Sequence, residues 1–137
     1  MENMITQQTF EKAEKKLKSL LFPVELNDVK IHSPNKDAIN VDFFKGVIRT
    51  DIDYVFSIVT KNYKLITNQE ALELGKKIFS KLFGNIQVDE IKPYNVMFPN
   101  TYSYCHIQLV HERVNFQVFE QDIWLPFIQI SNSYNKT

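Results

Sequence analysis

Residues 67–83 read TNQEALELGKKIFSKLF and carry the clearest structural signal in the chain. Thr67 and Glu70 have the spacing of a capping box, in which each side chain satisfies a free backbone N–H at the helix start. Gly84 follows at the position where helices commonly end. The segment therefore predicts an amphipathic helix, and its broad apolar stripe consists of Ala71, Leu72, Leu74, Gly75, Ile78, Phe79, Leu82 and Phe83.

A second helix is predicted over residues 6–22, before the first strands. Its apolar residues recur at helical spacing, and glutamate and lysine occupy the other side. Pro23 is expected to end it, because the residue before a proline is disfavoured in helical conformation. The predicted buried face consists of Phe10, Ala13, Leu17, Leu20 and Leu21.

Residues 28–60 alternate in the manner of β-strands, with a turn at residues 33–35. Gly46 is expected to interrupt one strand. Residues 54–59 are apolar on both faces, which favours a central strand. Residues 61–62 suit a tight turn, so residues 63–66 are predicted to form the returning strand of a hairpin.

The C-terminal half predicts strands at residues 86–91, 102–110, 114–119 and 123–130, with a turn at residues 111–113. Pro126 cannot donate a ladder hydrogen bond, so the last strand should be an edge strand or contain a bulge there. The whole pattern indicates a single α+β domain over residues 1–137, with two helices packed on a mostly antiparallel sheet.

Composition excludes several classes of protein. The 137 residues are 44% hydrophobic and 23% charged, as in a globular domain, and not as in a disordered chain or a rod. Sixteen basic and sixteen acidic residues cancel, which argues against a strongly basic nucleic-acid binder. Cys105 is the only cysteine, so no internal disulfide can form. We see no signal peptide and no apolar run near the roughly 20 residues of a membrane span, and we expect a cytoplasmic protein with no membrane partner.

Three stretches together resemble a known family: Tyr63–Ala71, Val110–His111, and Asp122–Pro126 leading into Ile130–Asn135. They are similar to the phage/plasmid-like proteins, a family of unknown function spread by prophages and plasmids, over roughly residues 53–137. Its members carry a Tyr-rich strand with an Asn-x-Glu helix start, and later a proline-containing strand leading into an Asn-Ser-Tyr turn. The resemblance implies a mobile-element context and no particular reaction.

The chain departs from that family after Tyr134, because Lys136 stands where the family usually has glycine. Family members also continue past this point with a second half. Residues 131–137 have turn-forming chemistry, as if another strand should follow. We therefore expect the domain to be the N-terminal part of a longer protein.

Two groups of residues are candidate metal sites. Cys105, His106 and His111 would need His32 to complete a zinc site, yet His106 and His111 should face opposite sides of one strand. Asp51 and Asp53 would share a strand face and could bind magnesium, but no third acid accompanies them. We expect no metal, no cofactor and no catalytic residue, and a metal-dependent enzyme ranks as the least favoured function.

The first functional hypothesis is an uncharacterised accessory domain with weak nucleic-acid binding. Tyr102 and Tyr104 alternate on a predicted strand and could stack bases, near an interleaved basic and aromatic stretch. The more ordinary interpretation is that these are half-buried tyrosines and solvated lysines. On the first hypothesis, Lys76→Glu with Lys77→Glu should weaken binding. The candidate residues are Lys61, Tyr63, Lys64, Lys76, Lys77, Lys81, Tyr102 and Tyr104.

The alternative is a protein-interaction or self-association domain. Residues 123–130 are largely apolar on both faces, and an apolar edge strand invites pairing with another chain. We expect a homodimer built around Trp124, Phe127 and Ile128. A native interface and an interface exposed by truncation are both compatible with this pattern.

Overall fold

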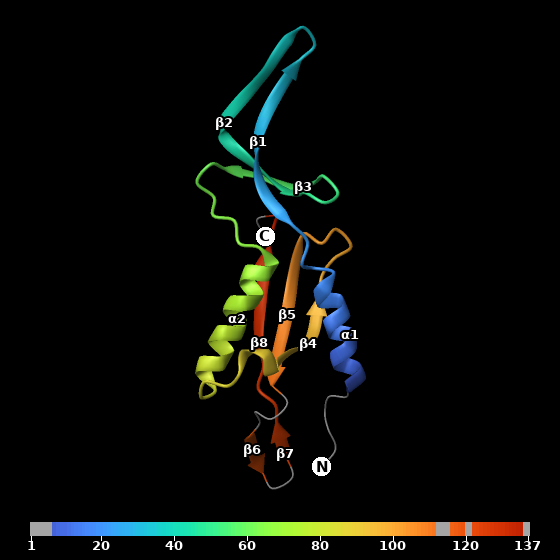
Figure 1. The fold of residues 1–137 in the computed structure, drawn as a ribbon, viewed down its shortest axis with the longest axis vertical. Helices are drawn as coiled ribbons and strands as arrows, with labels where there is room; N and C mark the ends of the chain where they lie inside the picture. Colours follow the sequence, from blue (N-terminus) through green and yellow to red (C-terminus); the bar gives the residue numbers. More distant parts are fainter. Residues whose placement is uncertain (1–6, 112–115, 120–121, 136–137) are drawn as a thin grey trace.

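The computed structural model describes residues 7–111, 116–119 and 122–135, and it has the predicted α+β architecture (Figure 1). Two three-stranded antiparallel sheets have the strand orders β1-β2-β3 and β4-β5-β8, and β6 pairs with β7. The elements are α1 (Gln7–Lys18), β1 (Val24–Ser33), β2 (Lys36–Arg49), β3 (Tyr54–Thr60), α2 (Asn68–Leu82), a 3₁₀ turn η1 (Val88–Glu90), β4 (Ile91–Met97), β5 (Tyr104–His111), β6 (Phe116–Phe119), β7 (Asp122–Trp124) and β8 (Ile128–Ser133).

The core lies between the two helices and one face of the β4-β5-β8 sheet, and it extends to Val24, Val47 and Val59 of the β1-β2-β3 sheet. In Figure 1, α1 lies over β4 and α2 over β8. The central strand β5 buries Cys105, Ile107 and Leu109 on this face. Gly75 lets α2 approach the sheet closely, because a Cβ built there would overlap the side chain of Ile130. None of the helices in the described part of the chain is long and apolar enough to cross a membrane.

The predicted start of α2 is confirmed. Thr67 is the N-cap, and its Oγ1 accepts a hydrogen bond of 3.2 Å from the Glu70 amide. The Glu70 carboxylate accepts in return from the Thr67 amide at 3.2 Å, which completes the capping box. Gly84 has a φ of +85°, a left-handed conformation that favours glycine just beyond a helix.

Removing the cap is expected to have a measurable cost. Thr67→Ala should lower the free energy of unfolding by about 1 kcal/mol, since the Glu70 amide loses its acceptor. Urea unfolding of both proteins measures this difference. Gln69→Ala, an exposed position in the same turn, is the control and should change stability little. Equal stability of Thr67→Ala and the parent would contradict the cap's contribution.

Helix α1 is shorter than predicted. It ends at Lys18, and the chain turns through Leu20, whose amide donates to the Leu17 carbonyl at 2.9 Å. Phe10, Ala13, Leu17 and Leu20 are buried as predicted, whereas Leu21 is exposed. The helix thus stops before Pro23 because the turn brings Leu20 into the core.

The β1-β2-β3 sheet differs from the prediction in three respects. Gly46 does not interrupt β2, where it is buried and pairs with both Asn27 and Ile58. β3 is an edge strand and not a central one, because the sheet order places β2 in the middle. Residues 63–66 form no strand; they are a loop whose Tyr63 and Leu65 pack against the core.

The far part of the β1–β2 hairpin projects away from the helices (Figure 1). The strand register shifts between Asp28 and Val29, where residues 42–44 of β2 have no partner on β1. Beyond that irregularity, residues 29–33 pair with residues 36–41, and nearly all of these side chains are exposed. We call residues 29–41 the arm. The predicted turn at residues 33–35 forms its tip.

The C-terminal strands also shift relative to the prediction. Residues 86–91 form mainly a loop and η1, and the strand β4 begins only at Ile91. β4 contains Pro93, which is accommodated because β4 is an edge strand with a register shift after that residue. Residues 125–127 are not in a strand, so Pro126 separates β7 from β8 and does not lie within one long strand. Most of the predicted turn at residues 111–113 lies outside the described residues.

Candidate functional site

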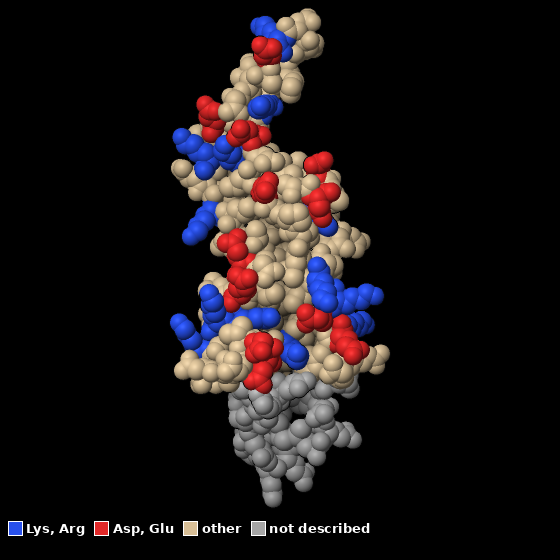
Figure 2. All heavy atoms as spheres, in the orientation of Figure 1, with Lys and Arg blue, Asp and Glu red and all other residues tan. Residues whose placement is uncertain are grey.

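The predicted basic and aromatic residues lie on different parts of the fold. Lys61 and Lys64 are in the loop before α2, and the other three lysines are on α2 itself. Tyr63 packs against the core. Figure 2 shows acidic side chains interspersed with basic ones over the helices, with no single basic face in this view. The set therefore does not form one continuous surface.

The two tyrosines predicted to share a strand face are separated. Tyr102 precedes β5 and has a φ of +59°, in a turn. Its ring stacks on Phe98 at a centroid distance of 5.1 Å and contacts the edge of Phe22, so it is part of the packed interior. Only Tyr104 lies within β5, where 39% of its surface is exposed. The prediction that Tyr102 and Tyr104 share a stacking face is wrong, because the chain turns at Tyr102 before β5 begins.

Tyr104 lies on the sheet face opposite the helices. Its neighbour Cys105 points into the core, and successive strand residues point to opposite faces. The pairs Tyr104–Ser133, His106–Ser131 and Gln108–Gln129 share that outer face. Since no described helix packs there, these polar side chains of β5 and β8 form an open hydrogen-bonding surface.

The end of this surface is hollowed into a groove of about 580 Å³. His106 Nδ1 lies 2.7 Å from Ser131 Oγ, and the Tyr104 and His106 rings meet edge to face at 5.8 Å. The sequence does not predict this cluster of side chains, because the pairing of β5 with β8 brings together residues that are 25 or more positions apart, such as His106 and Ser131. We define the polar groove by its lining residues, Tyr104, His106, Ser131, Asn132 and Ser133.

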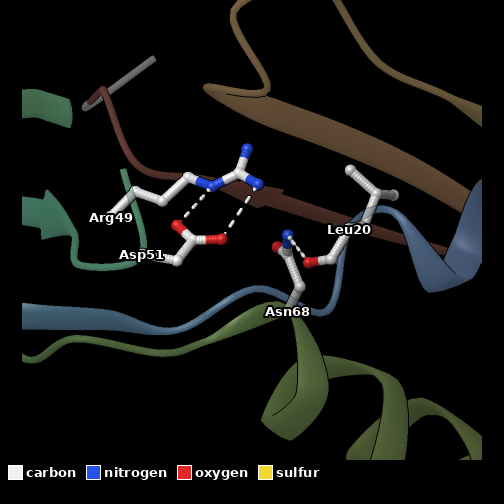
Figure 3. Close-up of polar contacts among 4 residues, drawn as sticks. All are labelled: Leu20, Arg49, Asp51 and Asn68. Carbon is white, nitrogen blue, oxygen red and sulfur yellow. Dashed lines mark hydrogen bonds and ion pairs between the residues drawn. The ribbon is translucent and has the colours of Figure 1, made fainter. Parts of the chain in front are cut away.

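Asp51 and Asp53 do not share a strand face as predicted, because both lie in the turn between β2 and β3. Asp51 accepts two hydrogen bonds from Arg49, from Nε at 2.8 Å and from Nη2 at 3.2 Å (Figure 3). The Arg49 hydrogen bond holds the pKa of Asp51 below its usual value. The Arg49 guanidinium also lies 4.0 Å from the centre of the Phe22 ring. Asp51 therefore anchors the guanidinium that covers this ring.

The residues of the considered zinc site are also dispersed. Cys105 is buried under the helices, whereas His106 points to the opposite face. His32 is exposed near the tip of the arm. Within the part of the chain that the structure describes, no group of three or more potential metal ligands is found.

A buried polar network joins the start of α2 to the end of α1 and to β8. The Asn68 side chain is 3% exposed, and its Nδ2 donates to the Leu20 carbonyl at 2.9 Å (Figure 3). Its Oδ1 accepts from Asn132 Nδ2 at 2.9 Å, and its backbone N–H donates to the Tyr134 hydroxyl at 2.7 Å. Asn132 also donates to the Ile66 carbonyl at 3.0 Å. This Asn68 network is structural, and it ties β8 to the start of α2 on the face of the sheet that the helices cover.

Two buried ionisable groups of this region, the Cys105 thiol and the Tyr134 hydroxyl, should make the free energy of unfolding decrease in alkaline solution. Burial raises the pKa of the Cys105 thiol from 9.0 to about 11, and burial likewise raises the pKa of the Tyr134 hydroxyl to about 12. The unfolded chain releases the thiol proton near its ordinary pKa, whereas the folded chain retains it. The contribution of the protonated Cys105 thiol to the free energy of unfolding is therefore fully present below about pH 9. It is lost as the pH rises toward about 11.

Urea unfolding at about pH 8 and about pH 10 tests this linkage. Stability of the parent should decrease more steeply between these values than stability of Cys105→Ala, which has no thiol to titrate. Parallel decreases in the two proteins would contradict a role of Cys105.

The predicted C-terminal interface is only partly described. Phe127 is 54% exposed, whereas Ile128 is partly buried against the core. Trp124 belongs to β7, and its side chain is not part of what the structure describes. β8 is an edge strand, as predicted for the last apolar segment. Exposed apolar side chains are instead concentrated in residues 31–58: Ile31, Ile39, Phe43, Phe44, Ile52, Tyr54, Val55 and Ile58.

Comparison with known proteins identified no relatives: no family model, no curated protein and no solved structure matches this chain.

Proposed function

We propose that this domain is a self-association module in which two copies dock through the β3 edge and the adjoining outer face of the β1-β2-β3 sheet. The observation that carries the proposal is the character of β3. It is an edge strand whose sequence, YVFSIVT, contains no charged residue, no proline and no glycine. Soluble proteins usually protect an edge strand with lysine, proline or a covering element, and β3 has neither of these residues.

The outer face of this sheet presents apolar side chains to solvent. Val47 and Val59 point inward and are buried, whereas Val55 and Ile58 are 52% and 46% exposed. Phe44, on the neighbouring strand β2, is 40% exposed. Apolar surface contributes about 25 cal/mol per Å² when it is removed from water, so covering this face favours association.

The arm supports the same proposal. Ile31 and Ile39 pair across its two strands, and each is 59% exposed. An isolated two-stranded ribbon is only marginally stable in water, so an arm with apolar side chains gains stability when another surface covers it. The net charge of zero means that two copies do not repel one another strongly.

The outer face of β1-β2-β3 is a better candidate than the predicted C-terminal interface. Ile128 and Ile130 of β8 pack toward the core, and the residues between them and after them on the open face are polar. Docking at β8 would therefore bury hydroxyl and amide groups, which is costly unless each finds a partner. Phe127 remains one exposed apolar side chain beside that strand.

Light scattering across a range of protein concentrations tests the proposal. The parent chain should form a dimer, and Ile58→Lys should shift it to the monomer because a charge would be buried in the contact. Ile39→Lys should have a smaller effect in the same direction. Leu74→Lys is the matched control, since Leu74 is 59% exposed but lies on α2.

A parent chain that stays monomeric throughout would contradict self-association. Equal loss of the dimer in Ile58→Lys and Leu74→Lys would contradict the assignment to β3. If only Phe127→Lys abolished the dimer, dimerisation would instead be assigned to the predicted C-terminal interface. The mobile-element context stays a prediction that rests on the short sequence resemblance alone.

A further inference from the structure

We propose that a groove between α1 and β4 binds phosphate. The groove has a volume of about 260 Å³, and its walls are Thr9, Lys12, Lys16, Tyr94 and Asn95. We call it the α1–β4 groove. This inference is independent of the proposed self-association, because the groove is formed by α1 and the β4-β5-β8 sheet and not by the β1-β2-β3 sheet.

Two cations of α1 line this groove with no carboxylate beside them. Lys12 and Lys16 are four residues apart, so their side chains lie on the same side of the helix, and neither has an acidic residue three or four positions away. In the part of the chain that the structure describes, neither lysine forms an ion pair. Like charges at this spacing repel one another, and an anion held between them offsets that repulsion.

The acidic residues of α1 lie on its other flank. Glu11 and Glu14 line a separate groove together with Lys18. That groove also includes Lys76 of α2, so this flank of α1 faces α2. The groove beside η1 likewise combines lysines with carboxylates. Carboxylates therefore offset much of the lysine charge in these two grooves, whereas the α1–β4 groove has an excess of positive charge in a chain whose net charge is zero.

Neutral hydrogen-bond donors complete the α1–β4 groove. Thr9 and Tyr94 contribute hydroxyl groups and Asn95 contributes an amide, and each of these groups can donate to an oxyanion. The floor consists of Ala13 and Val96, which are 4% and 2% exposed, so the packing of α1 on β4 fixes the spacing of the walls. Ammonium groups beside neutral donors match the oxygen atoms of a phosphate group.

The size of the groove and the geometry of β4 favour a small anion over an acidic peptide. The volume is below the roughly 300–1,000 Å³ of sites for drug-sized ligands. β4 is an edge strand, but its register shifts between Pro93 and Asn95 and Pro93 has no N–H group. The edge beside the groove therefore offers an interrupted hydrogen-bond ladder to a peptide strand. A phosphate ion needs no such ladder.

The test is a titration of the isotope-labelled protein with inorganic phosphate, followed by amide chemical shifts and compared with sodium chloride at equal ionic strength. Phosphate should produce saturable shifts in residues 9–16 and 94–96 that chloride does not produce. Lys12→Gln and Lys16→Gln should each weaken the affinity at least about fivefold, because each removes one charge-assisted hydrogen bond. Lys16→Arg keeps the positive charge and should retain saturable binding.

Lys18→Gln is the matched control, because Lys18 is an exposed lysine of the same helix that lines the groove on the other flank. It should leave the affinity within about twofold of the parent. Thermal unfolding in chloride checks that each variant folds. Lys12→Gln and Lys16→Gln should be no less stable than the parent, because each relieves the repulsion between two like charges.

Glycerol phosphate distinguishes two sources of the phosphate group. A weaker affinity than that of inorganic phosphate would assign the site to the free ion, and an equal or tighter affinity would assign it to phosphate monoesters. The absence of saturable shifts beyond those of chloride would overturn the proposal. So would shifts confined to residues outside the α1–β4 groove, or equal losses of affinity in Lys16→Gln and Lys18→Gln, which would indicate a general attraction of anions to α1.

Discussion

Replacing Asn68 by alanine is expected to lower the free energy of unfolding by about 3 kcal/mol. The variant removes the donor to the Leu20 carbonyl and the acceptor of Asn132 Nδ2, both in a buried environment. The Leu20 residue is fully buried, so its carbonyl cannot readily replace the lost bond with water. An unsatisfied buried polar group costs more than the lost hydrogen bond alone contributes.

Thermal and urea unfolding measure this loss, which corresponds to a decrease in Tm of about 10 °C. Gln69→Ala is the neighbouring control, because Gln69 is exposed and its side chain donates to the exposed Glu73 carboxylate. The Asn68 variant should also expose the helix start to faster hydrogen exchange. A change in stability no larger than that of the control would show that the network is not needed.

The second large effect is expected at Gly75, where α2 crosses β8. A methyl group there would overlap Ile130 Cδ1 and Cγ1, so Gly75→Ala should destabilise the protein by about 2 kcal/mol through overpacking. This loss exceeds the gain of roughly 1 kcal/mol that alanine usually brings to a helix interior relative to glycine. The net sign is therefore opposite to the one that helix propensity predicts.

A double-mutant cycle with Ile130→Ala provides the control. Shortening Ile130 removes the overlap, so Gly75→Ala in that background should become neutral or stabilising. Urea unfolding of the four proteins gives the coupling between the two positions. Additive effects would contradict direct packing of Gly75 against Ile130.

Local signals in the sequence were sufficient for part of the fold. The capping box of Thr67 and Glu70 was predicted because both partners lie within one helical turn. The buried side of α1 followed from its spacing for the same reason. The end of α1 was missed because Leu20 is placed by a turn against the core, and helical periodicity does not specify that turn.

Long-range pairing explains most of the differences. Residues 54–59 are apolar on both sides, which is typical of a central strand, yet β3 lies at an edge with Val55 and Ile58 exposed. Residue types alone do not distinguish burial within the protein from exposure of an apolar surface. The polar groove was missed because His106 and Ser131 meet only through the β5–β8 register. Tyr104 was the one groove residue that the sequence marked as a nucleic-acid contact, and His106 was marked only as a zinc ligand.

The arm has a consequence for the energetics of opening. Its amides are protected by one ladder of hydrogen bonds between residues 29–33 and 36–41, with little buried apolar surface behind them. Native proteins open in separate cooperative units, and a unit with few buried contacts opens at a lower free energy than the core does. The arm should thus exchange its amide hydrogens through a sub-global opening that leaves β4, β5, β8 and both helices intact. A partner that covers the arm should therefore slow amide exchange in the arm, even where the exchange that requires global unfolding is unchanged.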